Sequence, residues 1–138
     1  MAQASPETAQ RVLEETYEAI GRLDFDAWFA NTTPDYTLHD VPDLPDSEIY
    51  RGREEVRRWA DTTLSSLNDW RWVPEEFLYN DGRTVVVRVV LSGRSEAGVP
   101  IEMTVFHSFE MMDDKLAVVR AFLTEDQAFE GAGLPADA

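Results

Sequence analysis

His39 and Asp40 are neighbouring ionisable residues at a point where the chain changes character. They end the alternating stretch YTLHD, residues 36–40, and the acidic, proline-containing run DVPDLPD follows at once. A carboxylate that lies against an apolar wall has a raised pKa, and such a group can transfer protons at carbon. A carboxylate at the start of a loop also accepts hydrogen bonds from the loop's own amides. Asp40 is therefore either a general base at the rim of a pocket or the cap of a loop.

His107 is the second candidate, in the middle of IEMTVFHSFEMM, residues 101–112. Alternate side chains of a strand point to opposite faces of its sheet. One face then carries Met103, Val105, His107 and Phe109, and the other carries Glu102, Thr104, Phe106 and Ser108. Because the alternation does not tell which face borders a cavity, His107 is either a catalytic acid or a satisfied histidine of the core or of an interface.

Arg120 is the third candidate, within the apolar stretch KLAVVRAFL, residues 115–123. An arginine in such a strand is hard to bury without a partner, and Asp40 and Glu102 are the acids considered for that place. Two interpretations are open. Arg120 forms an ion pair that fixes the sheet, or it anchors an anionic or carbonyl group of a ligand.

The acidic run raises the question of a metal site, since Asp40, Asp43 and Asp46 recur every three residues. Calcium loops need a denser set of oxygen ligands, a glycine at a fixed place and a distal bidentate acid. Two histidines without any cysteine do not make a zinc site. The chain also lacks the motifs of nucleotide, dinucleotide and serine-hydrolase sites. We therefore expect no metal and no cofactor, and we interpret the run as an acidic lid over a cavity mouth.

Composition narrows the class of protein further. The 138 residues suit one domain, 1–138, and 43% of them are hydrophobic, enough for a core. A net charge of -15 argues against binding to nucleic acid and to anionic membranes. No apolar run approaches the roughly 18 residues of a membrane span. The first residues do not resemble a signal peptide, so a cytoplasmic location is expected.

Periodicity divides the chain into helices and strands. Helices are expected over residues 5–23, 24–31 and 50–67, with a short closing helix over 124–134. Strands are expected over 36–40, 70–79, 83–95, 101–112 and 115–123, with a turn at 33–36. This order predicts an α+β fold, a curved antiparallel sheet with three N-terminal helices on its concave face. Such a sheet leaves a cone-shaped cavity that suits a small ligand.

Several segments, taken together, resemble a known family. They are LDFDAWFANTTPDYTLHD, YRGREEVRRW, VFHSFEMMDDKLAVVRAFL and EDQAFEGAGL, and the resemblance spans about residues 8–134. The pattern is similar to the SnoaL-like branch of the nuclear transport factor 2-like superfamily. That superfamily includes ketosteroid isomerases, polyketide cyclases, dehydratases, epoxide hydrolases and pure binding proteins. The resemblance implies a cone fold, a cavity between sheet and helices, and commonly a homodimer.

The resemblance also assigns positions. Asp40 falls where ketosteroid isomerases carry their general base. The isomerase tyrosine falls at or near Thr16, and Tyr17 would point about 100° around the helix from it. The isomerase aspartate falls near Thr104. Steroid isomerisation is therefore not favoured, because the donors of an oxyanion hole are missing. The same alignment turns Thr104 and Phe106 toward the cavity, together with the strand face that carries Arg120 and Phe122.

These observations predict a small-molecule enzyme with cofactor-free acid-base chemistry on a hydrophobic, oxygenated substrate. Asp40 would be the base, Arg120 the anchor and His107 an acid. The residues expected to contact the substrate are Tyr17, Trp28, His39, Trp59, Thr104, Phe106 and Phe122. The aromatic ones among them also suit an ordinary core. The alternative is a ligand-binding or dimerisation domain of the same fold without turnover.

Overall fold

The computed structural model describes residues 4–42, 48–64 and 68–135 of the chain. Most of the expected acidic lid, which includes Asp43 and Asp46, lies outside the described residues. Four helices and six strands form in the described part. In chain order they are α1 (Pro6–Gly21), α2 (Phe25–Ala30), β1 (Thr32–His39), β2 (Ile49–Arg51), α3 (Gly52–Leu64), β3 (Asn68–Asn80), β4 (Thr84–Arg94), β5 (Pro100–Met112), β6 (Lys115–Phe122) and α4 (Glu125–Gly131).

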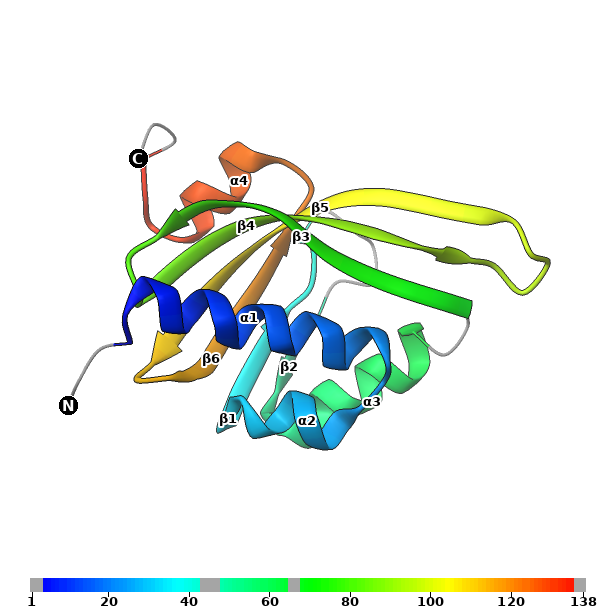
Figure 1. The fold of residues 1–138 in the computed structure, drawn as a ribbon, viewed down its shortest axis with the longest axis horizontal. Helices are drawn as coiled ribbons and strands as arrows, with labels where there is room; N and C mark the ends of the chain where they lie inside the picture. Colours follow the sequence, from blue (N-terminus) through cyan, green and yellow to red (C-terminus); the bar gives the residue numbers. More distant parts are fainter. Residues whose placement is uncertain (1–3, 43–47, 65–67, 136–138) are drawn as a thin grey trace.

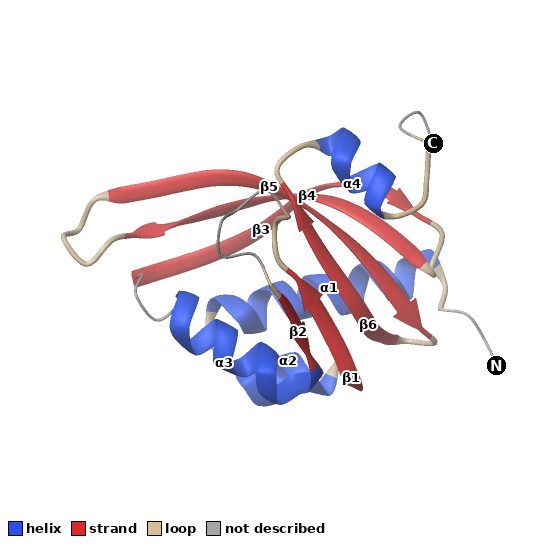
Figure 2. Ribbon diagram, turned by 180° about the vertical axis from the view of Figure 1, so that it is seen from behind, coloured by secondary structure: helices blue, strands red, loops and turns tan. Residues whose placement is uncertain are grey.

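The strands form one curved sheet in the order β2-β1-β6-β5-β4-β3. Helices α1, α2 and α3 lie on one side of the sheet and α4 lies on the other (Figures 1 and 2). The expected α+β class with a curved sheet is confirmed. The strands β3 to β6 form the expected antiparallel meander, while β1 pairs with β6 in parallel and so joins the N-terminal half to the sheet.

The start of the sheet differs from the prediction. The expected turn at 33–36 is wrong, because β1 already begins at Thr32. The exposed Pro34 and Asp35 fall where the register between β1 and β6 shifts, between Thr32 and Thr37. A bulge of this kind accommodates a proline without ending the strand. The strand β2 was not expected either, since its three residues are too few to show an alternation.

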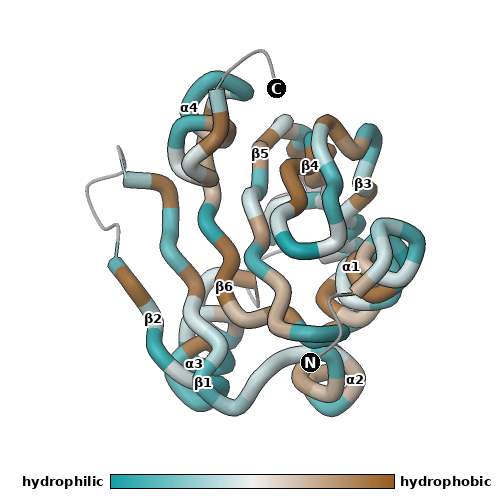
Figure 3. The backbone as a smooth tube through the Cα atoms, turned by 90° about the vertical axis from the view of Figure 1, so that its left-hand side faces the viewer, coloured by the Kyte–Doolittle hydropathy of each residue, from teal (hydrophilic) through white to brown (hydrophobic). Residues whose placement is uncertain are grey.

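Helix α1 shows why its sequence folds as expected. The side chain of Ser5 accepts a hydrogen bond from the amide of Thr8 at 3.1 Å, and Pro6 occupies the first turn, where no donor is needed. The buried stripe of the helix includes Val12, Leu13 and Tyr17. α1 packs against β3, and Figure 3 shows the sheet curling from β2 toward this helix.

A smaller apolar cluster occupies the outer face of the sheet. Helix α4, capped by Thr124, buries Phe129 against Phe122 and Val86. The cluster covers only part of that face, while the larger core lies between the concave face and α1, α2 and α3. No helix in the described part of the chain is long and apolar enough to cross a bilayer.

The turn between β3 and β4 yields a prediction about stability. Gly82 has a φ of 87°, and the carbonyl of Ala4 lies where a Cβ would be built. Gly98 has a φ of 81°, but a Cβ there would meet no atom within 4 Å. A non-glycine residue in this conformation costs about 1–2 kcal/mol at either position. Only Gly82→Ala also pushes away the segment that leads into α1. We expect it to lower the free energy of unfolding by at least about 1 kcal/mol more than Gly98→Ala in urea denaturation.

Hydrogen bonds hold the N-terminal segment in place, so it cannot easily move away from that methyl group. Ser5 caps α1, and the side-chain amide of Asn80 donates a hydrogen bond to the carbonyl of Pro6 at 2.9 Å. Equal losses in the two variants would show that residues 4–6 are not held against the turn.

Candidate active site

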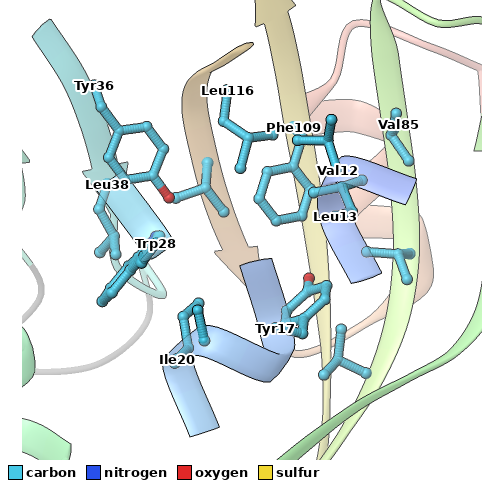
Figure 4. Close-up of a cluster of buried hydrophobic side chains, with 14 of the residues drawn as sticks. Val12, Leu13, Tyr17, Ile20, Trp28, Tyr36, Leu38, Val85, Phe109 and Leu116 are labelled. Carbon is cyan, nitrogen blue, oxygen red and sulfur yellow. The ribbon is translucent and has the colours of Figure 1, made fainter. Parts of the chain in front are cut away.

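A cavity of about 260 Å³ lies between the concave face of the sheet and the N-terminal helices. Its walls are mostly apolar, and all four tryptophans of the chain contribute to them. Figure 4 shows Tyr17 and Ile20 from α1, Trp28 from α2 and Tyr36 from β1 around one interior space. Phe109 approaches that space from β5. The curvature of the sheet therefore leaves a hollow that aromatic side chains narrow without filling.

One hydrogen bond spans the cavity wall between helix and sheet. The hydroxyl of Tyr17 and Nδ1 of His107 are 2.7 Å apart, and both side chains are buried. Their rings are nearly parallel, at 10°, with centroids 5.8 Å apart. A hydrogen bond to an imidazole nitrogen runs in the plane of the ring, so the two rings lie edge to edge. Phe109 stands almost perpendicular to both, at 84° and 89°.

Burial decides the charge of this pair. Desolvation lowers the pKa of His107 from 6.5 to about 4, because the charged imidazolium is disfavoured away from water. Desolvation likewise raises the pKa of Tyr17 well above 10.0, followed by a smaller effect of Tyr36. Both groups are therefore neutral near pH 7. The pair is a neutral hydrogen bond in which either partner can be the donor, depending on the tautomer of His107.

The second ring nitrogen of His107 is the atom that a ligand can use. Among the described residues only Nδ1 is hydrogen bonded, to Tyr17, and the side chain lines the cavity. When Tyr17 donates to Nδ1, Nε2 carries the proton and is a donor. When Nδ1 donates to Tyr17, Nε2 is an acceptor. His107 can therefore bind either kind of partner.

Asp40 borders the same cavity. Its Oδ1 accepts a hydrogen bond from the amide of Val41 at 2.8 Å, and its own amide donates to the carbonyl of Glu48 at 3.1 Å. Asp40 thus combines the two arrangements considered for it, since it caps the following loop and also lies at the cavity.

His39 lies beside Asp40 and is half-buried. In the sheet it is the register partner of Arg120 on β6. Burial lowers the pKa of His39, and the positive charges of Arg120 and Arg51 lower it further. His39 is therefore biased toward the neutral form, although it belongs to the rim and not to the deep part of the cavity.

The expected position of Arg120 in the cavity is wrong. Val119 and Ala121 line the cavity, so the alternation of β6 turns Arg120 to the outer face. There its Nη1 lies 3.1 Å from Oε2 of Glu110, a partly exposed ion pair. The partner is thus neither Asp40 nor Glu102. Phe122 follows the same alternation and packs under α4.

Strand β5 also turns its faces the opposite way from the alignment with isomerases. Met103, Val105, His107 and Phe109 line the cavity. Thr104 is exposed on the outer face, and Phe106 packs there with Phe122 and Phe129. The sequence leaves open which face of this strand lines the cavity, and in the structure it is the face with His107. The expected contacts of Thr104 and Phe106 with a substrate are therefore wrong.

Helix α1 points Tyr17 inward in place of its neighbour. Thr16 is buried, donates to the carbonyl of Val12 at 2.7 Å and lies 3.4 Å from the side-chain nitrogen of Asn31. Tyr17 points about 100° around the helix from Thr16, and this rotation brings its side chain into the cavity. Trp28 and Trp59 lie in the walls, in the places expected for them.

Four aromatic lining residues were not singled out from the sequence: Tyr36, Trp70, Trp72 and Phe109. Each carries a usable signal. Tyr36 alternates with Leu38 on β1, and Phe109 shares the face of His107. Trp70 and Trp72 are two apart on β3, so one face of that strand carries both. No group of three His, Asp or Glu side chains gathers anywhere in the described residues in a way that suits a metal ion.

Comparison with solved structures gives the same fold. A putative SnoaL-like polyketide cyclase from Jannaschia sp. CCS1 has a TM-score of 0.72 at 16% identity, with 84% of this chain and 85% of that chain covered. RV0760c from Mycobacterium tuberculosis, in complex with estradiol-17beta-hemisuccinate, has a TM-score of 0.71 at 19% identity over 85% and 92%. A ketosteroid isomerase-like protein from Catenulispora acidiphila, in complex with trimethylamine, has 0.70 at 16% over 92% and 95%.

A search of curated proteins finds no match. The solved structures lie at identities that show the fold alone. The sequence itself, however, matches the family model of the SnoaL-like domain over residues 13–132, which is most of the chain. The chain therefore belongs to the SnoaL-like family.

Proposed function

We propose that the protein is an enzyme that performs cofactor-free acid-base chemistry on a compact, hydrophobic, oxygenated molecule bound in the cavity. The observation that carries the proposal is the buried hydrogen bond between Tyr17 and His107 in otherwise apolar surroundings. Polar groups that converge in an apolar pocket are the usual signature of a small-molecule site. The small organic molecules bound to two of the neighbouring structures support the same use of the fold.

The size of the cavity limits the substrate. Its volume of about 260 Å³ is just below the roughly 300–1,000 Å³ typical of small-molecule sites. One or two fused rings fit this space better than a four-ring molecule. The apolar walls favour a hydrocarbon frame, and the neutral His107 with Tyr17 favours an uncharged oxygen such as a carbonyl.

The chemistry follows from two groups on the same cavity. Asp40 takes a proton from a carbon next to the carbonyl, and the electron pair of the broken C–H bond moves to the carbonyl oxygen. His107 stabilises that oxygen by a hydrogen bond from its protonated Nε2, while Tyr17 donates to Nδ1. When the proton on Asp40 exchanges with solvent before the carbon is protonated again, the result is hydrogen exchange. When Asp40 delivers the proton to another carbon of a conjugated enolate, the result is isomerisation. Because the pKa of His107 is lowered to about 4, the neutral ring donates a hydrogen bond and does not need to lose a proton.

A second candidate is a ligand-binding protein without turnover. The hydrogen bond from the Val41 amide to Asp40 favours it, because that bond gives Oδ1 of the carboxylate a structural role at the start of the loop. The two candidates share the cavity and differ only in whether Asp40 moves a proton.

The family resemblance further suggests a homodimer, which we include as part of the proposal. Light scattering coupled to size-exclusion chromatography would measure the mass of the particle in solution. The mass of one chain, 15.7 kDa, would contradict it.

Proton transfer can be tested with 2-tetralone, a two-ring ketone whose carbon next to the carbonyl is acidic. We expect the protein to accelerate exchange of these protons for deuterium in heavy water, followed by NMR. Asp40→Asn should lower the rate by at least about a hundredfold, since it removes the base. Asp35→Asn changes the net charge equally at an exposed site on β1 and should leave the rate unchanged.

Binding of 2-tetralone without accelerated exchange, seen by saturation-transfer NMR, would favour the second candidate. An equal loss of rate in both aspartate variants would show that Asp40 acts through net charge alone and would contradict its role as the base.

The buried histidine also predicts how stability depends on pH. The pKa of His107 is about 4 in the folded chain and near 6.5 when the chain is unfolded. Between these values the unfolded chain binds more protons, so acid destabilises the fold. Above pH 6.5 the neutral His107 does not reduce the stability of the fold. Between pH 6.5 and pH 4 the free energy of unfolding falls by at most about 3 kcal/mol.

We therefore expect the free energy of unfolding of the unchanged protein, relative to His107→Gln, to fall as the pH drops from about 6.5 to 4, in urea titrations. His39→Gln is the control, because His39 is only half-buried and should give a smaller difference. A difference that stays constant over this range would mean that His107 is accessible to water.

A further inference from the structure

Aromatic rings make up much of the cavity wall. They come from Tyr17, Trp28, Tyr36, Trp59, Trp70, Trp72 and Phe109. All four tryptophans of the chain line this cavity, and two of them, Trp70 and Trp72, lie on the same strand, β3. A purely aliphatic wall would serve a neutral hydrocarbon equally well. A neutral hydrocarbon ligand therefore does not by itself explain why all the tryptophans lie at one cavity.

The rings enclose the space from more than one direction. Trp72 is nearly parallel to Tyr17 and to His107, with centroids 6.4 Å and 5.9 Å away, and Trp70 continues this arrangement 5.9 Å from Trp72. Phe109 is perpendicular to Tyr17 and His107. A group bound in this corner meets aromatic surface on two sides. Enclosure of this kind is how proteins bind alkylated ammonium groups, through the negative faces of aromatic rings.

The charges at the cavity have a single sign. Asp40 is the one residue with a formal charge among the described residues that line it, and neither lysine nor arginine is present there. The histidines do not oppose a cation, because burial lowers the pKa of both. The net charge of -15 attracts cations to the molecule as a whole. An anionic ligand would find no lysine or arginine among those lining residues that the structure describes.

We propose that the ligand of this cavity carries a positive charge, as an alkylated ammonium group held among the aromatic rings and balanced by Asp40. This inference rests on the cavity being a ligand site, as in the proposed function, and adds the charge of the ligand. An alkylated ammonium suits the walls better than a primary one, because it has fewer N–H groups that need hydrogen bonds after water is lost. Its charge would also stabilise negative charge that forms on a neighbouring carbonyl oxygen.

Two probes of nearly the same shape isolate the charge. They are (3-hydroxyphenyl)trimethylammonium and 3-tert-butylphenol, which differ in a nitrogen cation against a neutral carbon. Both carry a hydroxyl for His107. We expect the cation to bind about tenfold more tightly in calorimetric titration at an ionic strength of about 150 mM, where long-range attraction is screened.

Matched variants separate the sources of the preference. Asp40→Asn should reduce it several-fold, whereas Asp35→Asn, with the same change of net charge at an exposed site, should preserve it. Trp72→Leu keeps an apolar side chain at a partly exposed position of this aromatic corner. It should weaken the cation about fivefold and the phenol much less.

Equal affinities for the two probes, tighter binding of the phenol, or no binding of either would overturn the inference. So would a preference that falls equally in Asp35→Asn and Asp40→Asn, because it would then come from net charge. The exchange of 2-tetralone reports on the proposed function independently, since that ketone has no charge. Exchange without a preference for the cation would leave the proposed function in place and reject this inference alone.

Discussion

The hydrogen bond between Tyr17 and His107 is the interaction on which the interior of the molecule depends. It joins α1 to β5 and places two polar side chains inside an apolar core. Each of these groups would cost about 1–3 kcal/mol if it were buried without a partner. Paired, they satisfy one another and fix how α1 is rotated over the sheet. The one side of His107 that Tyr17 does not use then becomes the polar point of the cavity.

The hollow next to this pair follows from shape. The meander of long strands curves, and α1 reaches its concave side along β3, while α2 and α3 lie under β1 (Figures 1 and 3). Large rings such as Trp28 and Tyr36 border the remaining space without interdigitating as aliphatic chains do. Close packing of interiors is the rule, so an unfilled space of this size is a feature that core packing alone does not explain. The ligand proposed for this cavity would complete the packing.

Helical spacing, turn residues and the order of elements were enough to predict the α+β class and the concave position of the N-terminal helices. The side-chain faces could not be predicted in the same way. Alternation along β5 and β6 separates two sets of residues, but both sets contain large apolar side chains, because α4 covers part of the outer face. The choice between the faces therefore came from the alignment with isomerases, which placed Arg120, Phe106 and Phe122 inside. The outer cluster under α4 is a long-range contact that neither strand reveals alone.

The rotation of α1 about its axis was also not predicted correctly. An alignment of residue positions put the isomerase donor at Thr16 and left Tyr17 only as a substrate contact, whereas the helix turns Tyr17 toward His107. A shift of one residue on a helix and the opposite face on a strand belong together, because Tyr17 can reach His107 only when both occur. Tyr17 is one residue from the position that the alignment gave to the isomerase tyrosine, and His107 is three residues from the position that it gave to the aspartate. A fold can keep a donor in its cavity while the residues that supply it move, and this is why the chemistry of such a site has to be argued from its own atoms.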